Sequence, residues 1–279
     1  MYDISLSING VTLAMNHGAG YDIFTISGLT GTTGKLNTAM SNLSLGEDYT
    51  YGTVSGITLN VRGVILDGNT EKKQALLNTV LPLGEGTLSI YTTPSSGDRP
   101  SLYRTIDVVV KETPTISQEK HSKFSFSLYA PKPIWKAPAA EAIVLTNTVS
   151  GGNTVEVTIA GQTKADFSLQ IGVQANGLKD YSIYFGDAQT YILGKYIYLN
   201  FRKYDEDGVA SGSTVKLFRD KGKITLTIDN VKHNECIYAL STLDALDIGT
   251  HTFHMDADAN NLTRVIYYPS YIGVLVDGV

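Results

Sequence analysis

The sequence predicts a mainly β protein made of two domains, with one α-helix in the first. Three observations predict it. Apolar and polar residues alternate with a period of two along most of the chain, as in strands that bury one face. The chain contains 27 glycines, many of them in turn-forming pairs. It has 279 residues, a length typical of about two domains, and a proline-rich segment near its middle marks a boundary.

In the first domain, residues 1–136, strand patterns surround a single helix pattern. Asn9-Gly10 is the pair that best tolerates the positive φ angles of a type I′ turn, so it predicts a hairpin. The other strand patterns in this half lie at residues 57–66, 104–111 and 122–130.

The helix pattern is "NTEKKQALLNTVLP", residues 69–82. Asn69 or Thr70 can cap its start, and Pro82 marks its end. An apolar stripe with i,i+4 spacing predicts the face that docks on a sheet. That face consists of Leu76, Leu77, Val80 and Leu81.

In the second domain, residues 137–279, short strand patterns follow one another at regular spacing, separated by Asn-Gly, Asp-Gly or Lys-Gly. This spacing predicts a β-sandwich. One short helix is expected at residues 241–249, "STLDALDIG".

The domain boundary is predicted in "APKPIWKAP". Pro131, Pro133 and Pro138 lack the backbone N–H and disfavour helix in the preceding residue, so a stiff extended connection is expected. Such a connection restricts the angle between two domains, unlike a Gly/Ser linker. Trp135, the only tryptophan, is expected to pack over the junction between the domains. The alternative is an exposed tryptophan that stacks on a ligand.

No motif in the sequence indicates chemistry. The chain has no G-x-S-x-G nucleophile elbow and no phosphate-binding loop. His251 and His254 lie three apart, so in a strand they point to opposite faces and do not converge on a metal ion. The segment "DADANN", from Asp256, starts like a calcium loop but lacks its glycine and its final glutamate. We therefore expect no enzymatic activity, no cofactor and no catalytic or metal-binding residue.

Charge and hydropathy disfavour two further classes of protein. Residues 1–136 hold 11 Lys+Arg and 11 Asp+Glu. The whole chain holds 22 Lys+Arg and 27 Asp+Glu, so residues 137–279 hold 11 Lys+Arg and 16 Asp+Glu. Neither half has a basic stripe, which disfavours binding to nucleic acid phosphates or to a membrane surface. The N-terminus has no secretory signal pattern, and no segment is apolar enough to insert into a membrane.

Residues 20–136 resemble the N-terminal domain of phage distal tail (Dit) proteins, the baseplate hub of long non-contractile tails. The resemblance rests on four segments in order: "YDIFTISGLTG", "ITLNVRGVILDGNTEKKQALLNTVLP", "GTLSIYTTPSSGDRPSLYRTIDVVV" and "KFSFSLYAPKPIWK". Lys132-Pro133 stands where an acidic residue is commoner in that family. The second half is similar only in its class of fold.

The resemblance implies a tail-tube-like split β-barrel or sandwich with one helix, followed by a galectin-like β-sandwich. It implies a homo-oligomer, a hexameric ring at the virion tail tip that is assembled in the host cytoplasm. The implied partners are the tail tube protein, the tail-associated hub or lysin protein and the receptor-binding protein. DNA would pass through the lumen of the ring without specific binding.

Three alternatives stay open. A carbohydrate-binding host-adhesion module, of a phage tail or a cell surface, would use tyrosines as its aromatic platform. The tyrosines available are Tyr181, Tyr184, Tyr191, Tyr196, Tyr198, Tyr267, Tyr268 and Tyr271. A tail-tube or spike-hub relative, including the type VI secretion tube protein, is disfavoured because such tube proteins usually have one domain. An enzyme is the least supported.

Overall fold

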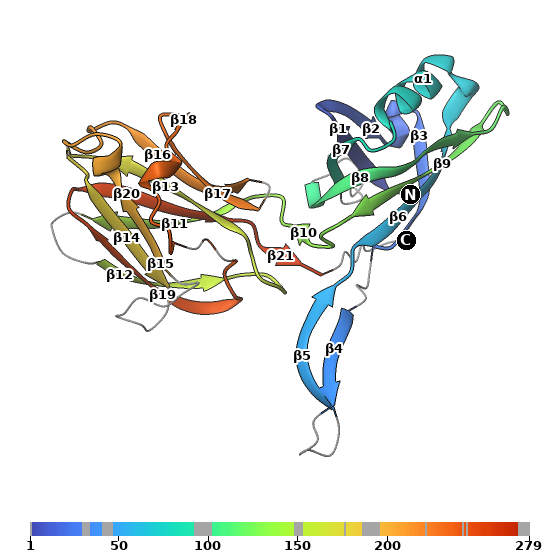
Figure 1. The fold of residues 1–279 in the computed structure, drawn as a ribbon. Coiled ribbons are helices and arrows are strands. Elements are labelled where there is room, and N and C mark those ends of the chain that lie inside the picture. The colour runs from blue at the N-terminus through green and yellow to red at the C-terminus, as the bar shows by residue number, and fades with distance from the viewer. Residues whose placement is uncertain are drawn as a thin grey trace. The chain divides into compact units, whose positions relative to one another are not determined.

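The computed structural model describes residues 2–29, 34–40, 47–91, 102–147, 153–175, 177–185, 196–220, 222–241, 243 and 245–272. The chain forms two compact units (Figure 1). The first contains the residues up to Pro138 and, at the other end of the described chain, Tyr271 and Ile272. The second is Ala139–Ser270. The protein is mainly β, which confirms the predicted fold class.

The first unit is built on one large antiparallel sheet. Along the sheet the main strands follow the order β2-β1-β7-β8-β9-β6-β3. Their bounds are β1 Asp3–Ile8, β2 Val11–Met15, β3 Tyr21–Ser27, β6 Ile57–Ile65, β7 Glu85–Tyr91, β8 Leu102–Ile116 and β9 Ser122–Ala130. The strands β4, Gly34–Met40, and β5, Glu47–Val54, form a separate two-stranded sheet.

The two ends of this strand order approach each other. Tyr2, just before β1, forms an antiparallel bridge with Ile23 on β3, and its N–H donates to the Ile23 carbonyl at 3.0 Å. The apolar side chains enclosed by the strands form one core. A sheet that bends back on itself around one core corresponds to the predicted split barrel.

The single α-helix, α1, spans Thr70–Thr79 and begins at the predicted cap. Asn69 Oδ1 accepts hydrogen bonds from the amides of Glu71 and Lys72, at 2.8 and 3.3 Å. Two short 3-10 helices, His17–Ala19 and Leu66–Gly68, also belong to this unit.

Only half of the predicted docking face of α1 is buried. Leu76 and Val80 are fully buried, whereas Leu77 is 41% exposed and Leu81 48% exposed. Neighbouring positions on a helix point about 100° apart, so one line of contact buries only one of the two i,i+4 pairs. Leu77 and Leu81 are therefore only partly covered by their own unit.

Replacing Asn69 with alanine is expected to lower the free energy of unfolding of the first unit by about 1 kcal/mol, because it leaves two amides of the first turn without their acceptor. Chemical denaturation followed by circular dichroism measures this. Asn78→Ala, on the exposed side of α1 and bonded only to Gln74, is the matched control and should change stability by less than about 0.5 kcal/mol. Equal effects of the two variants would contradict the capping role.

The proline-rich segment is part of the first unit rather than a free linker. Trp135–Lys136 forms the short strand β10, which pairs with β8. Lys136 Nζ lies 2.7 Å from Asp107 Oδ2. Pro133 is buried, while Pro131 and Pro138 are exposed. The three prolines lie outside β10, so their missing N–H groups remove no donor from its pairing.

Trp135 is fully buried and belongs to the core of the first unit. Its burial contradicts the exposed ligand-stacking alternative, whereas packing over the domain junction stays a prediction. Its indole N–H has no hydrogen-bond acceptor within the part of the chain that the structure describes.

The chain returns to the first unit after the second. Tyr271 belongs to the first unit, and β21, Ser270–Tyr271, pairs with β10. The guanidinium of Arg104 lies 3.9 Å from the ring centre of Tyr271 and 4.5 Å from that of Tyr103. The second unit is therefore inserted between two segments of the first and is tethered at both of its ends.

The second unit is a sandwich of a six-stranded and a four-stranded sheet (Figure 1). The first has the order β11-β20-β13-β16-β17-β18 and the second β12-β19-β14-β15. Their bounds are β11 Glu141–Asn147, β12 Asn153–Ile159, β13 Phe167–Val173, β14 Asp180–Phe185, β15 Tyr196–Asn200, β16 Thr214–Asp220, β17 Lys223–Ile228, β18 Val231–Lys232, β19 Gly249–Ala257 and β20 Asn261–Tyr267.

Side chains from both sheets form one core, so the predicted β-sandwich is confirmed. The only cysteine, Cys236, is buried. Two 3-10 helices, Phe201–Lys203 and Asn234–Cys236, lie in connections. The helix expected at residues 241–249 is wrong for the part of that segment that is described, which forms extended connections. The galectin-like detail of this unit stays a prediction.

Candidate functional site

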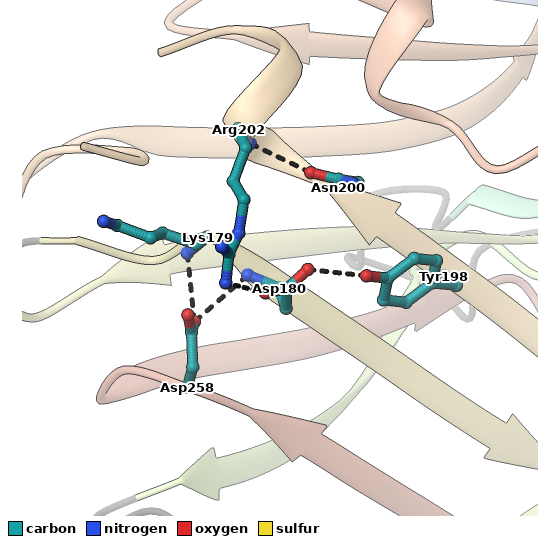
Figure 2. A network of polar contacts seen from close by, with 6 residues as sticks. All are labelled: Lys179, Asp180, Tyr198, Asn200, Arg202 and Asp258. Carbon is teal, nitrogen blue, oxygen red and sulfur yellow. Dashed lines mark hydrogen bonds and ion pairs between the residues drawn. The ribbon is translucent and has the colours of Figure 1, made fainter. Parts of the chain in front are cut away.

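The second unit carries a polar network on the outer face of its four-stranded sheet (Figure 2). Alternation along β14 and β15 points Tyr181 and Leu199 into the core and leaves Asp180 and Tyr198 on the outside. Tyr198 donates its hydroxyl hydrogen to Asp180 Oδ1 at 2.5 Å, and Arg202 Nη2 lies 2.9 Å from Asp180 Oδ2. One carboxylate thus orients a tyrosine and an arginine.

A second carboxylate holds the start of β14. Asp258 Oδ1 accepts from the backbone amides of Lys179 and Asp180 at 3.0 and 3.1 Å (Figure 2). Asn200 Oδ1 accepts from the amide of Arg202 at 3.1 Å, which starts the short helix that carries the arginine. The positions of these side chains are therefore set by backbone bonds, and the network is preorganised.

The hydrogen bond to Asp180 raises the pKa of Tyr198 to about 12, with burial and the charge of Asp180 as further causes. A raised pKa in the folded state means that the contribution to stability is complete below the ordinary tyrosine pKa near 10 and is lost as the pH rises through about 12. Tyr198→Phe should therefore reduce the loss of stability between pH 10 and pH 12. Denaturation at three pH values in that window checks this, and identical pH dependence in both proteins would contradict it.

The tyrosines singled out from the sequence have different environments. Tyr181 and Tyr267 are buried. Three others form a row on the outer face, with ring centres 4.8 Å apart for Tyr184 and Tyr196 and 6.4 Å apart for Tyr196 and Tyr198. The remaining three are distributed as follows: Tyr268 is exposed, Tyr271 lies in the first unit, and Tyr191 is outside the described residues.

The histidines form hydrogen bonds rather than a shared site. His251 Nε2 lies 2.7 Å from the carbonyl of Asp247, and His254 Nδ1 lies 2.9 Å from Thr154 Oγ1. Within the described ranges, no three His, Cys, Asp or Glu residues are grouped so that they could hold a metal ion. Among the same residues, no helix has the length and apolar character needed to cross a membrane.

The first unit exposes three leucines at and after the end of α1, which we call the leucine surface: Leu77, Leu81 and Leu83. Their exposed fractions are 41%, 48% and 82%. Leu83 also has a positive φ of 61°, a conformation that is unfavourable for a branched apolar residue. An apolar side chain that is both strained and exposed contributes little to its own unit, so the leucine surface is a candidate contact with another molecule.

A polar cavity of about 510 Å³ lies on β6, β8 and β9 of the first unit. Ser127 Oγ lies 2.8 Å from both Asn60 Oδ1 and Glu112 Oε2, and its single hydrogen serves one of them at a time. Among the described residues that line this cavity, the group next to Ser127 that can accept a proton is the Glu112 carboxylate, and none of these residues is a histidine.

Comparisons with known proteins give matches in structure but not in sequence. No family model matches the chain, and no curated protein matches it. The structure is similar to that of the Dit protein (gp 19.1) of phage SPP1, described as a paradigm of the hub adsorption apparatus in phages that infect Gram-positive bacteria. The TM-score is 0.65 at 13% identity, and the match covers 96% of this chain and 98% of that one.

Two further matches are to structures of the phage P2 baseplate in its activated conformation. The one with calcium has a TM-score of 0.58 at 9% identity and covers 98% of this chain and 100% of the other. The one with strontium has a TM-score of 0.50 at 10% identity, with the same coverage. The likeness to Dit proteins predicted for residues 20–136 is thus confirmed at the level of the fold, and it extends over both units: the chain has the fold of a phage Dit hub protein.

Proposed function

We propose that this protein is a structural hub of a phage tail tip, located in the virion and without enzymatic activity. The observation that carries the proposal is the coverage of the structural match, which includes both units and nearly the whole length of the SPP1 hub protein. A shared sandwich alone would be a weak argument, because such folds have many functions. Two units joined in the same order over the same length are a more specific arrangement.

In the proposed assembly, six copies form a closed ring through their first units. One side of the ring contacts the tail tube, and the other contacts the tail-associated hub or lysin protein. The second units hold receptor-binding components, and DNA passes through the lumen without specific binding. A closed ring requires two different, complementary surfaces on each copy. The leucine surface supplies an apolar area for one of them.

The double connection between the units supports this role. A hub must present its outer domains in the same way from every copy. The second unit is attached through the chain after Pro138 and again through Tyr271, which Arg104 holds by its ring face. Two covalent connections restrict reorientation more than one does.

Labelling of virions with an antibody raised against the purified chain tests the location. We expect gold label at the end of the tail, between the tube and the most distal fibres, in electron micrographs. Gold label on the capsid or along the whole tube would contradict the proposal. So would the absence of label from both intact and tip-stripped virions.

A further inference from the structure

The outer face of the four-stranded sheet contains a hollow of about 330 Å³. Its lining includes Tyr198 on β15, Asp180 and Ser182 on β14, and Asp256 and Asp258 at the end of β19. The register explains why it forms: Ser182 lies opposite Tyr198 on one side and opposite Asp256 on the other. A small side chain between two larger ones leaves a depression, and its volume is in the range typical of small-ligand sites.

Ser182, which lines this hollow, is a polar residue that is only 7% exposed. Among the described residues, the enclosed polar side-chain atom that lacks a hydrogen-bond partner is the indole nitrogen of Trp135, so the Ser182 hydroxyl is not an enclosed, unsatisfied group. It borders the open hollow, where a water molecule or a ligand group can donate to it and accept from it.

The charges of the lining exclude several classes of ligand. The carboxylates of Asp180, Asp256 and Asp258 repel phosphates, sulfates and nucleic acids. A bound metal ion is disfavoured because Asp180 already pairs with Arg202, while Asp258 accepts two backbone amides. A purely apolar ligand would cover the Ser182 hydroxyl and the exposed carboxylate of Asp256 without offering either of them a hydrogen bond, and burying polar groups in this way is costly.

We infer that this hollow binds a neutral saccharide unit. Sugar hydroxyls can donate to the Asp256 carboxylate and can both donate to and accept from Ser182 Oγ. The C–H face of a pyranose ring packs against an aromatic ring, and Tyr198 is held in place for this by its bond to Asp180. Tyr196 and Tyr238, with ring centres 6.4 and 5.8 Å from that of Tyr198, restrict its motion further.

Saturation-transfer NMR on the full chain tests the inference. The probes are glucose, galactose, rhamnose, N-acetylglucosamine and N-acetylgalactosamine at millimolar concentration, together with a glycan array. We expect at least one saccharide to bind, and Ser182→Ala and Asp256→Asn each to weaken its binding by about ten-fold. Both substitutions are small and conserve the shape of the sheet.

Matched controls lie on or beside the other sheet of the same unit. Ser168→Ala on β13 and the exposed Asp166→Asn should leave saccharide binding unchanged. Three results would overturn the inference. The first is that no probe binds, and the second is that the hollow variants and the control variants bind equally well. The third is that a tail protein, in place of a saccharide, occupies the hollow. Binding of one sugar needs only one copy of the chain, so this test is independent of ring formation and of the proposed hub function.

Discussion

Replacing Trp135 with alanine is expected to lower the free energy of unfolding of the first unit by about 3–5 kcal/mol. Trp135 is the bulkiest of the fully buried side chains and lies in the core enclosed by the large sheet. Its removal takes away the apolar contacts of the indole and leaves a cavity that the antiparallel strands around it do not refill. The second unit has a separate core, so its own unfolding should not change.

Differential scanning calorimetry of the full chain measures both transitions. In the parent protein, the fluorescence of the only tryptophan identifies which transition belongs to the first unit. Phe24→Ala is the matched control, because Phe24 is an aromatic residue of the same unit that is 50% exposed, and it should cost less than about 1 kcal/mol. Two results would contradict the placement of Trp135 in this core. One is a Trp135→Ala effect confined to the unfolding transition of the second unit, and the other is an effect on the first unit no larger than that of Phe24→Ala.

Replacing Leu81 and Leu83 together with aspartate is expected to weaken assembly of the chain by roughly 30-fold or more, because two charges would then have to be buried in an apolar contact. Both residues are exposed, at 48% and 82%, so the stability of their own unit should change by less than about 1 kcal/mol. Leu83→Asn sharpens the test. Asparagine tolerates the positive φ at this position better than leucine does, so this variant should be at least as stable as the parent and still assemble less well.

Sedimentation velocity over a range of concentrations measures the assembly of these variants, and denaturation measures their stability. The control is Val231→Asp, which places a charge at a residue of the second unit that is 60% exposed. Assembly is expected to be unaffected by Val231→Asp. Unchanged assembly in the Leu81/Leu83 variant would show that the leucine surface is not an interface between copies.

The elements of the fold were largely predictable from local patterns. Period-two alternation identified the main strands, and the cap at Asn69 marked the start of α1. Burial of the helix was predicted less well, because Leu77 and Leu81 have the same i,i+4 spacing as Leu76 and Val80. The pattern does not reveal which of two neighbouring apolar lines the sheet contacts.

Long-range features were not predictable in the same way. The prolines around Trp135 have the composition of a linker, yet Trp135–Lys136 pairs with both β8 and β21, because the prolines lie outside these two residues and remove no donor from the pairing. Nothing in the sequence near Tyr271 signals that the chain returns to the first unit. Alternation places Ser182 and Tyr198 on the outer face of their sheet. Their proximity to Asp256, more than fifty residues away in the chain, depends on strand order and register, which no local pattern encodes.

The ring itself is tested most directly by the mass and shape of the assembled protein. Native mass spectrometry and negative-stain electron microscopy of the purified chain, alone and mixed with its tail tube protein, should show six copies closed around a central opening. Assembly only in the presence of the tube protein would equally agree with a hub that forms on the tail. A protein that stays monomeric in both conditions, or forms open filaments or dimers, would contradict the hub function.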